Sequence, residues 1–201
     1  MKKMETFTEA KPFVNDPGYK RRRQAALTEL ENQLSAGSID SPVIEIVKGF
    51  NRLPFCFTLQ SCFGHFVHKC QKDSRNVEPL SYYQDELSVV EYRIAYMALC
   101  LRNNEFGRTL FNDFHAIAKR NPDYIQFGSA EWFWKVCPNS YVLQVEPSRS
   151  RNKDKIRVNI KEALHIELVR NKAFGEIRKV LQQKELLSER KQKSGTESGK
   201  L

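Results

Sequence analysis

Apolar residues recur every three or four positions in four segments of the chain. These segments cover residues 16–37, 41–51, 106–118 and 160–187. The first two begin with a polar residue followed by proline, which favours the first turn of a helix, and the first ends at a glycine, which favours the end of one. The spacing therefore predicts four helices, with two N-terminal helices and a long C-terminal helix.

Shorter segments between these helices are rich in aromatic and β-branched residues and predict β-strands. The segment 91–101 is apolar on both faces, which indicates one fully buried strand. Gly64 marks a turn between a strand and a return strand or extended segment at 65–70. The other predicted strands lie at 55–60, 123–127 and 140–146. Because helices and strands mix without strict alternation, the prediction is an α+β fold with a mixed sheet.

Length and composition indicate a single domain. A chain of 201 residues with 40% hydrophobic residues can bury one core of ordinary size. We place this domain at 13–187, after a flexible N-terminal arm at 1–12. The segment 188–201 is poor in apolar residues and is predicted to be a disordered tail.

The apolar runs and the cysteines are used to predict the cellular compartment of the protein. No apolar run approaches the roughly 18 residues of a membrane-spanning helix, and none follows the first basic residues as in a secretory leader. The five cysteines are odd in number and scattered along the chain. These features indicate reduced thiols, a cytoplasmic location and no membrane partner.

The net charge of +9 is concentrated in a few segments. Residues 147–161 contain six basic residues and one acidic residue, and the first 23 residues are also basic. Local basicity favours contact with a phosphate backbone, and a solvated loop is the alternative. The predicted RNA-binding residues are Arg149, Arg151, Lys153, Lys155, Arg157, Arg21, Arg22 and Arg23.

The glycines exclude two common nucleotide folds. Before the C-terminal tail, no two glycines lie within four residues of each other, so neither a G-x-G-x-x-G nor a P-loop is present. The fold is therefore predicted not to be Rossmann.

The elements of a Cys2His2 zinc set lie within nine residues of the chain, at Cys62, His65, His68 and Cys70. Structural zinc sites usually take two pairs from separate parts of the chain, so we assign no metal ligand and keep a small zinc-binding protein as an alternative.

One unit of the sequence, residues 38–66, combines a predicted helix with a predicted strand and turn. It resembles the start of the tRNA wybutosine-synthesis methyltransferase family, the third enzyme of that pathway, in which a helix D-x-x-V-x-E-L-V-x-x-[LI]-N leads into a strand F-T-T-S-S-C-S-G-R. Leu59, Gln60 and His65 stand where the family has threonine, serine and arginine. The matching positions are Asp40, Val43, Glu45, Val47, Asn51, Phe57, Thr58, Ser61, Cys62 and Gly64.

The resemblance implies S-adenosylmethionine-dependent methylation of a tricyclic guanine derivative beside a tRNA anticodon, on a non-Rossmann domain covering 13–187. It implies cofactor or substrate contacts at Thr58, Ser61, Cys62, Gly64 and His65, and it assigns no catalytic residue. Arginine is permanently charged and a neutral imidazole is not, so we expect His65 to bind weakly, bind another group, or depend on pH. A non-catalytic RNA-binding module on the same fold is the alternative function, and a purely structural tight turn is the alternative role of Ser61 and Gly64.

Overall fold

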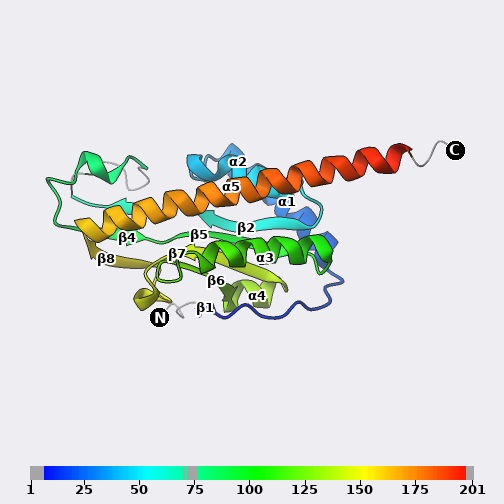
Figure 1. Ribbon diagram of the computed structural model, residues 1–201, viewed down its shortest axis with the longest axis horizontal. Coiled ribbons are helices and arrows are strands. Elements are labelled where there is room, and N and C mark those ends of the chain that lie inside the picture. The colour runs from blue at the N-terminus through cyan, green and yellow to red at the C-terminus, as the bar shows by residue number, and fades with distance from the viewer. Residues whose placement is uncertain (1–6, 70, 72–76, 198–201) are drawn as a thin grey trace.

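The computed structural model describes residues 7–69, 71 and 77–197, with side chains through residue 187 (Figure 1). The helices are α1 (Tyr19–Ser35), α2 (Ile44–Arg52), α3 (Glu105–Lys119), α4 (Glu131–Val136) and α5 (Ile160–Glu197), with short 3-10 turns at Ser41–Val43, Leu80–Tyr82 and Ser148–Ser150. The strands are β1 (Phe7–Thr8), β2 (Cys56–Cys62), β3 (His65–Val67), β4 (Val89–Arg93), β5 (Ala95–Leu101), β6 (Ile125–Ala130), β7 (Ser140–Val145) and β8 (Lys155–Asn159).

The strands form two sheets. Five are ordered β1-β6-β7-β5-β2 and three are ordered β3-β4-β8. The α+β class, the N-terminal helices and the long C-terminal helix are confirmed. A sheet with mixed strand directions was expected. Each described strand pair is antiparallel, so this part of the prediction is wrong.

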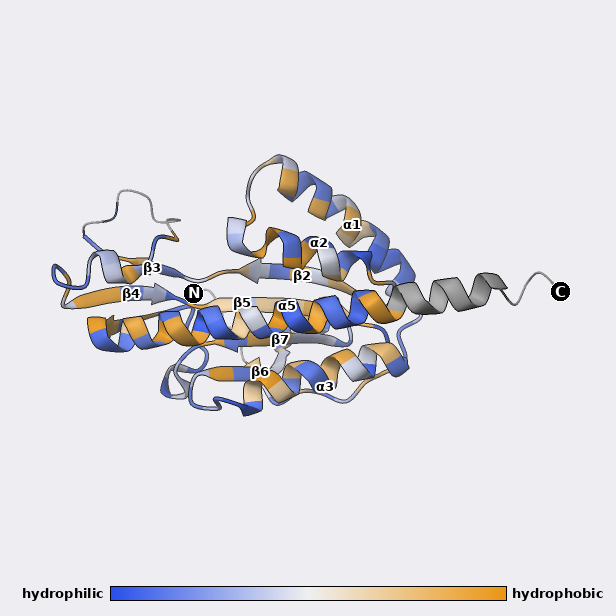
Figure 2. Cartoon of the chain, turned by 45° about the horizontal axis from the view of Figure 1, so that its top comes forward, coloured by the Kyte–Doolittle hydropathy of each residue, from blue (hydrophilic) through white to orange (hydrophobic). Residues whose placement is uncertain are grey.

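The strand β5 is buried on both faces because both faces of the larger sheet are covered. Met97 and Leu99 belong to the main core, which α2, α3 and α5 cover (Figure 2). Ala98 and Cys100 point the other way and pack with residues from β1, α1 and the segment around α4. An apolar pattern on both faces therefore identified this strand correctly.

A bent ribbon joins the two sheets. β2 pairs with β5 as far as Cys62 opposite Tyr96, and β3 pairs with β4 from His65 opposite Arg93. Of the two alternatives for 65–70, the return strand is wrong, because β3 pairs with β4 and not with β2, and the extended segment is confirmed for His65–Val67. The expectation of one strand over 91–101 is also wrong, because this segment forms two strands, β4 and β5, in different sheets.

Gly64 sets the bend of this ribbon. Its φ is +85°, in the left-handed region that favours glycine. A Cβ on Gly64 would lie 2.7 Å from the Cβ of Ala95, which follows β4 on the opposite side of the ribbon. The chain can turn this closely only because position 64 has no side chain.

Both ends of the domain extend further than expected. Phe7 is buried and its backbone N–H donates to Asn152 Oδ1 over 2.6 Å, so the part of the arm from residue 7 packs on the domain; residues 1–6 lie outside the described range. α5 continues to Glu197, where a disordered tail was predicted from 188, and 198–201 are not described. Of the helices in the described ranges, none is both long and apolar enough to cross a membrane.

Candidate functional site

Two side chains from the helical part of the 38–66 unit bind β2 and the turn after it: Asn51 lies in the last turn of α2, and Asp40 lies just before the 3-10 turn that leads into α2. Asn51 Nδ2 donates to Thr58 Oγ1 over 2.5 Å, and Asn51 Oδ1 accepts from the Thr58 backbone N–H over 3.2 Å. Asp40 Oδ2 accepts from the Phe63 backbone N–H over 2.7 Å and lies 3.2 Å from His65 Nε2. The helical and strand parts of the 38–66 unit are therefore linked directly at both ends.

His65 is buried and charged. The hydrogen bond to Asp40, followed by one to Cys62, raises the pKa of His65 to about 9 although burial opposes the charge. Burial acts to raise the pKa of Asp40, but its hydrogen bonds from His65 and Phe63 bring it below the usual value. The imidazole is thus protonated at neutral pH, where the sequence suggested a neutral ring. Its charge is neutralised by Asp40, and at 7% exposure it offers no free cation.

Arg170, on α5, holds the turn from inside the protein. It is 3% exposed, and its Nη1 donates to the Gly64 carbonyl over 2.9 Å. The guanidinium carbon lies 4.2 Å from the centre of the Phe63 ring and 5.3 Å from that of Phe66. Burial lowers the pKa of Arg170, but Glu167 on the same helix lies 3.5 Å away and supplies the opposite charge. Sequence reasoning missed this residue, whose one signal was a basic position within an apolar helical stripe.

Two predicted site residues line a groove of about 290 Å³ between α1, α2 and β2. Thr58 and Ser61 lie on its β2 side, and Ala26, Glu29 and Leu30 from α1 lie opposite. The other three predicted residues, Cys62, Gly64 and His65, do not line this groove. The structure therefore divides the predicted site into a groove and a buried turn.

Two of the candidate zinc ligands, Cys62 and His65, lie together in the described residues, and His68 lies apart from them. Cys62 and His65 are joined by Asp40, and one ligand atom from each residue lies within 4.8 Å of the others. His68 packs instead on Tyr83, with 4.8 Å between ring centres. Cys70 lies outside the described residues.

Part of the predicted basic patch lies on the outer face of the three-stranded sheet. The pairing register aligns His65 with Arg93 and Arg93 with Lys155, and it places Arg157 opposite Glu91. Directly paired residues of an antiparallel sheet project to the same face. Glu91 pairs with Lys155 over 3.1 Å and with Arg93 over 3.5 Å. Three exposed or partly exposed cations therefore surround a single carboxylate, and Arg93 was not among the predicted residues.

Several other predicted RNA-binding residues are held by groups of the protein itself. Arg22 pairs with Asp16, and Arg149 pairs with Glu162. Arg151 donates to Gln126 over 2.8 Å, and Arg23 donates to the Asn51 carbonyl over 2.8 Å. Arg21 and Lys153 are exposed. The basic segments therefore contribute fewer free charges than their composition suggests.

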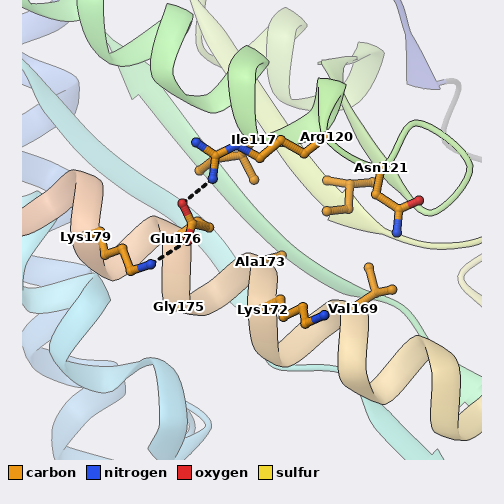
Figure 3. Close-up of a pocket in the computed structure, with 10 residues that line it drawn as sticks. Ile117, Arg120, Asn121, Val169, Lys172, Ala173, Gly175, Glu176 and Lys179 are labelled. Atoms are coloured by element: carbon orange, nitrogen blue, oxygen red, sulfur yellow. Dashed lines mark hydrogen bonds and ion pairs between the residues drawn. The ribbon is translucent and has the colours of Figure 1, made fainter.

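A second groove, of about 540 Å³, lies between α3 and α5 (Figure 3). Its wall includes Ile117 and Val169, and at its rim Glu176 forms ion pairs with Arg120 and Lys179. None of the residues predicted from the sequence lines it. Glu176 binds two of the three cations in the lining and Lys172 remains, so the groove keeps a net positive charge.

Comparisons with known proteins show similarity in fold alone. No family model matches the chain, and no curated protein does. A structure of the PH1069 protein from Pyrococcus horikoshii matches with a TM-score of 0.50 and 18% identity, over 83% of this chain and 95% of that one. A structure of the PH1069 protein from Pyrococcus horikoshii OT3 has 16% identity over 84% and 94% of the two chains, with a TM-score of 0.48. A hypothetical protein from Aeropyrum pernix has 14% identity over 71% and 98%, with a TM-score of 0.39. The first of these similarities supports a single α+β domain that is not Rossmann.

Proposed function

We propose that this chain is a divergent S-adenosylmethionine-dependent RNA methyltransferase-like protein, with tRNA as the RNA implied by the 38–66 resemblance. The observation that carries the proposal is the convergence of residues matched in that unit. Asp40 binds the backbone at Phe63 and the ring of His65, and Asn51 binds both the backbone and the side chain of Thr58. Three matched positions, Asp40, Asn51 and Thr58, thus belong to one hydrogen-bonded unit, which supports the resemblance.

The groove beside Thr58 and Ser61 suits one part of a cofactor or a single base. Its volume of about 290 Å³ is just below the roughly 300–1,000 Å³ typical of small-molecule sites. Glu29 at the groove supplies a carboxylate, which suits a cofactor that carries a sulfonium and an ammonium group. Methyl transfer mainly requires that the donor carbon and the acceptor atom be held in line, and Thr58, fixed by Asn51, gives the groove a rigid polar group.

RNA would bind the outer face of the three-stranded sheet. Arg93, Lys155 and Arg157 lie there on adjacent strands, within two strand spacings of the Gly64 turn. Strands are about 4.8 Å apart, so this distance is on the order of 10 Å. A phosphate backbone on this face would therefore bring a nucleotide close to the Gly64 turn.

The first test is binding of S-adenosylmethionine, measured by calorimetry and by the shift in melting temperature. Heat and stabilisation are expected in the wild type. Thr58→Val, which keeps the side-chain shape but removes the hydroxyl, should weaken both. The absence of heat and of a thermal shift in the folded wild-type protein would contradict the methyltransferase proposal.

The second test is the salt dependence of tRNA affinity. The double variant K155A/R157A should bind more weakly and show a salt slope smaller by about 0.7–0.9 for each phosphate that the two removed cations neutralise in the wild type. The double variant K119A/K172A, which removes two exposed lysines on the side of α3 and α5, is the matched control. Equal slopes in the two variants would reject the outer face as the RNA surface.

One observation favours a non-catalytic RNA-binding module as the second candidate. His65 stands where the resembled family has arginine, and its charge is already bound by Asp40. The site therefore lacks a permanent free cation at this position. Transfer of a labelled methyl group from S-adenosylmethionine to tRNA that carries the tricyclic guanine derivative would support the first candidate, and binding of that tRNA without transfer would support the second.

We also propose a cytoplasmic location. The four cysteines in the described part of the chain, Cys56, Cys62, Cys100 and Cys137, are free thiols. Free thiols suit a reducing compartment. Tagged protein found in a secretory compartment would contradict this assignment.

A further inference from the structure

The Asp40, Cys62 and His65 side chains have the composition of a three-ligand zinc site. One potential ligand atom from each lies within 4.8 Å of the other two. Zinc binds carboxylate oxygen, thiolate sulfur and imidazole nitrogen at about 2.0–2.3 Å, so ligands around a tetrahedral ion are roughly 3.3–3.8 Å apart. We propose that these three residues bind a zinc-class divalent ion and leave its fourth position open. Small side-chain movements would close the site.

The substitution of histidine for arginine makes this site possible. An arginine side chain stays protonated and has no lone pair for a metal, whereas a neutral imidazole is a common zinc ligand. With arginine at position 65, this group would consist of Asp40 and Cys62 alone. In this chain the proposed metal site therefore depends on the histidine at position 65.

The groups around the three side chains fit a metal site. The Phe63 backbone N–H holds Asp40 over 2.7 Å, and Arg170 holds the Gly64 carbonyl over 2.9 Å, so the turn that carries two of the ligands is fixed. Outer hydrogen bonds of this kind orient metal ligands. His65 Nδ1 is buried and forms no hydrogen bond among the residues described, whereas Nε2 lies beside Asp40.

The charges balance when the ion is bound. Asp40 and a Cys62 thiolate together neutralise a divalent ion, and Glu167 remains close to the nearby guanidinium of Arg170. Binding forms metal–oxygen, metal–sulfur and metal–nitrogen bonds. It releases to solvent the thiol proton of Cys62 and the additional ring proton of His65, and no oxidant or reductant is involved. The inference does not rest on the proposed function, because binding needs neither RNA nor S-adenosylmethionine.

Titration of the reduced, metal-free full-length protein with cobalt(II) tests the proposal. Cobalt bound to a thiolate gives a charge-transfer absorption band, and one equivalent should bind and be displaced by zinc. Cys62→Ser and His65→Arg should lose the band and weaken binding by more than the roughly 10–100-fold that loss of an outer hydrogen-bond partner causes. Cys137→Ala, which removes another buried thiol, should keep the band.

Two results would overturn the metal site. One is a wild-type protein that binds no stoichiometric cobalt, and the other is a His65→Arg variant that binds cobalt as tightly as the wild type. If Cys62→Ser fails to fold, His65→Arg decides the question, because an arginine can still pair with Asp40. Circular dichroism of each variant confirms that the fold is kept.

Discussion

Replacement of Arg170 by methionine tests how the turn at Gly64 is held. The side chain is 3% exposed and reaches from α5 to the Gly64 carbonyl, a separation of 106 residues along the chain. Methionine fills similar space and favours a helix about as well as arginine does. The substitution therefore removes the charge and the hydrogen bonds with little change in backbone preference.

The expected loss follows from the contacts. A hydrogen bond from a charged donor contributes about 1.5–3 kcal/mol, and a desolvated cation above an aromatic ring contributes about 2 kcal/mol. Part of the stability lost with these contacts is recovered in the variant, because it no longer has to desolvate a buried charge and because methionine packs well. Glu167 would lose its cation and keep the Leu80 backbone N–H at 3.2 Å. Arg170→Met should therefore lower the free energy of unfolding by about 3 kcal/mol, at the lower end of the range for breaking a buried ion pair.

Urea unfolding, followed by circular dichroism, measures this loss. Arg178→Met is the matched control, because Arg178 lies on the same helix, is exposed, and donates to the Pro42 carbonyl over 2.7 Å. Its loss should stay below about 1 kcal/mol. Adding Glu167→Gln should cost less in the Arg170→Met background than in the wild type, since the two side chains interact. Equal losses for Arg170→Met and Arg178→Met would refute the role assigned to the buried guanidinium.

Three further substitutions give expected outcomes. Burial raises the pKa of Glu146 from 4.5 to about 7, so the stability that Glu146 contributes is fully present below pH 4.5 and is lost as pH rises through about 7. Glu146→Gln should therefore be more stable than the wild type at pH 8, by at most about 3 kcal/mol, and equal to it near pH 4.5, as measured by urea unfolding. The raised pKa of His65 contributes stability that is fully present below pH 6.5 and lost as pH rises through about 9. In metal-free protein, Asp40→Asn should therefore cost about 1.5–3 kcal/mol at pH 6 and much less above pH 9, and a loss independent of pH would contradict the ion pair. Gly64→Ala should lower the free energy of unfolding by at least about 2 kcal/mol, because of backbone strain and contact with Ala95. This loss would lower the melting temperature by roughly 4–8 °C. An unchanged melting temperature would show that the bend tolerates a side chain.

Local patterns predicted the elements well, whereas the way strands pair required the folded chain. The apolar run at 95–101 indicated a buried strand because both of its faces are covered. The core-facing residues change from even positions on β4, Val90 and Tyr92, to odd positions on β5, Met97 and Leu99. The apolar run at 95–101 conceals this change because both of its faces are buried. The partners of the two strands follow from the bend at Gly64.

The same distinction applies to the charged residues. Composition located the basic segments correctly, but it could not show which cations are bound by carboxylates from distant elements. Arg149 binds Glu162 and Lys155 binds Glu91, so each leaves a weaker positive field than a free side chain. Arg93 lies in an otherwise near-neutral segment, and only the strand register brings it beside Lys155. Charge counts therefore predict a basic surface less reliably than they predict a basic segment.

Position 65 connects the two proposals and allows them to be separated. In metal-free protein the protonated ring binds Asp40, and a bound metal requires the ring to lose that proton, so His65 cannot pair with Asp40 as a cation and bind a metal at the same time. Arginine would keep a permanent charge and exclude the metal. His65→Arg should therefore abolish cobalt binding, and, if the turn that carries His65 contacts S-adenosylmethionine or RNA as the resemblance implies, the same variant should bind that ligand at least as tightly as the wild type. Loss of both activities would show that the histidine is needed for the turn itself and serves neither ligand.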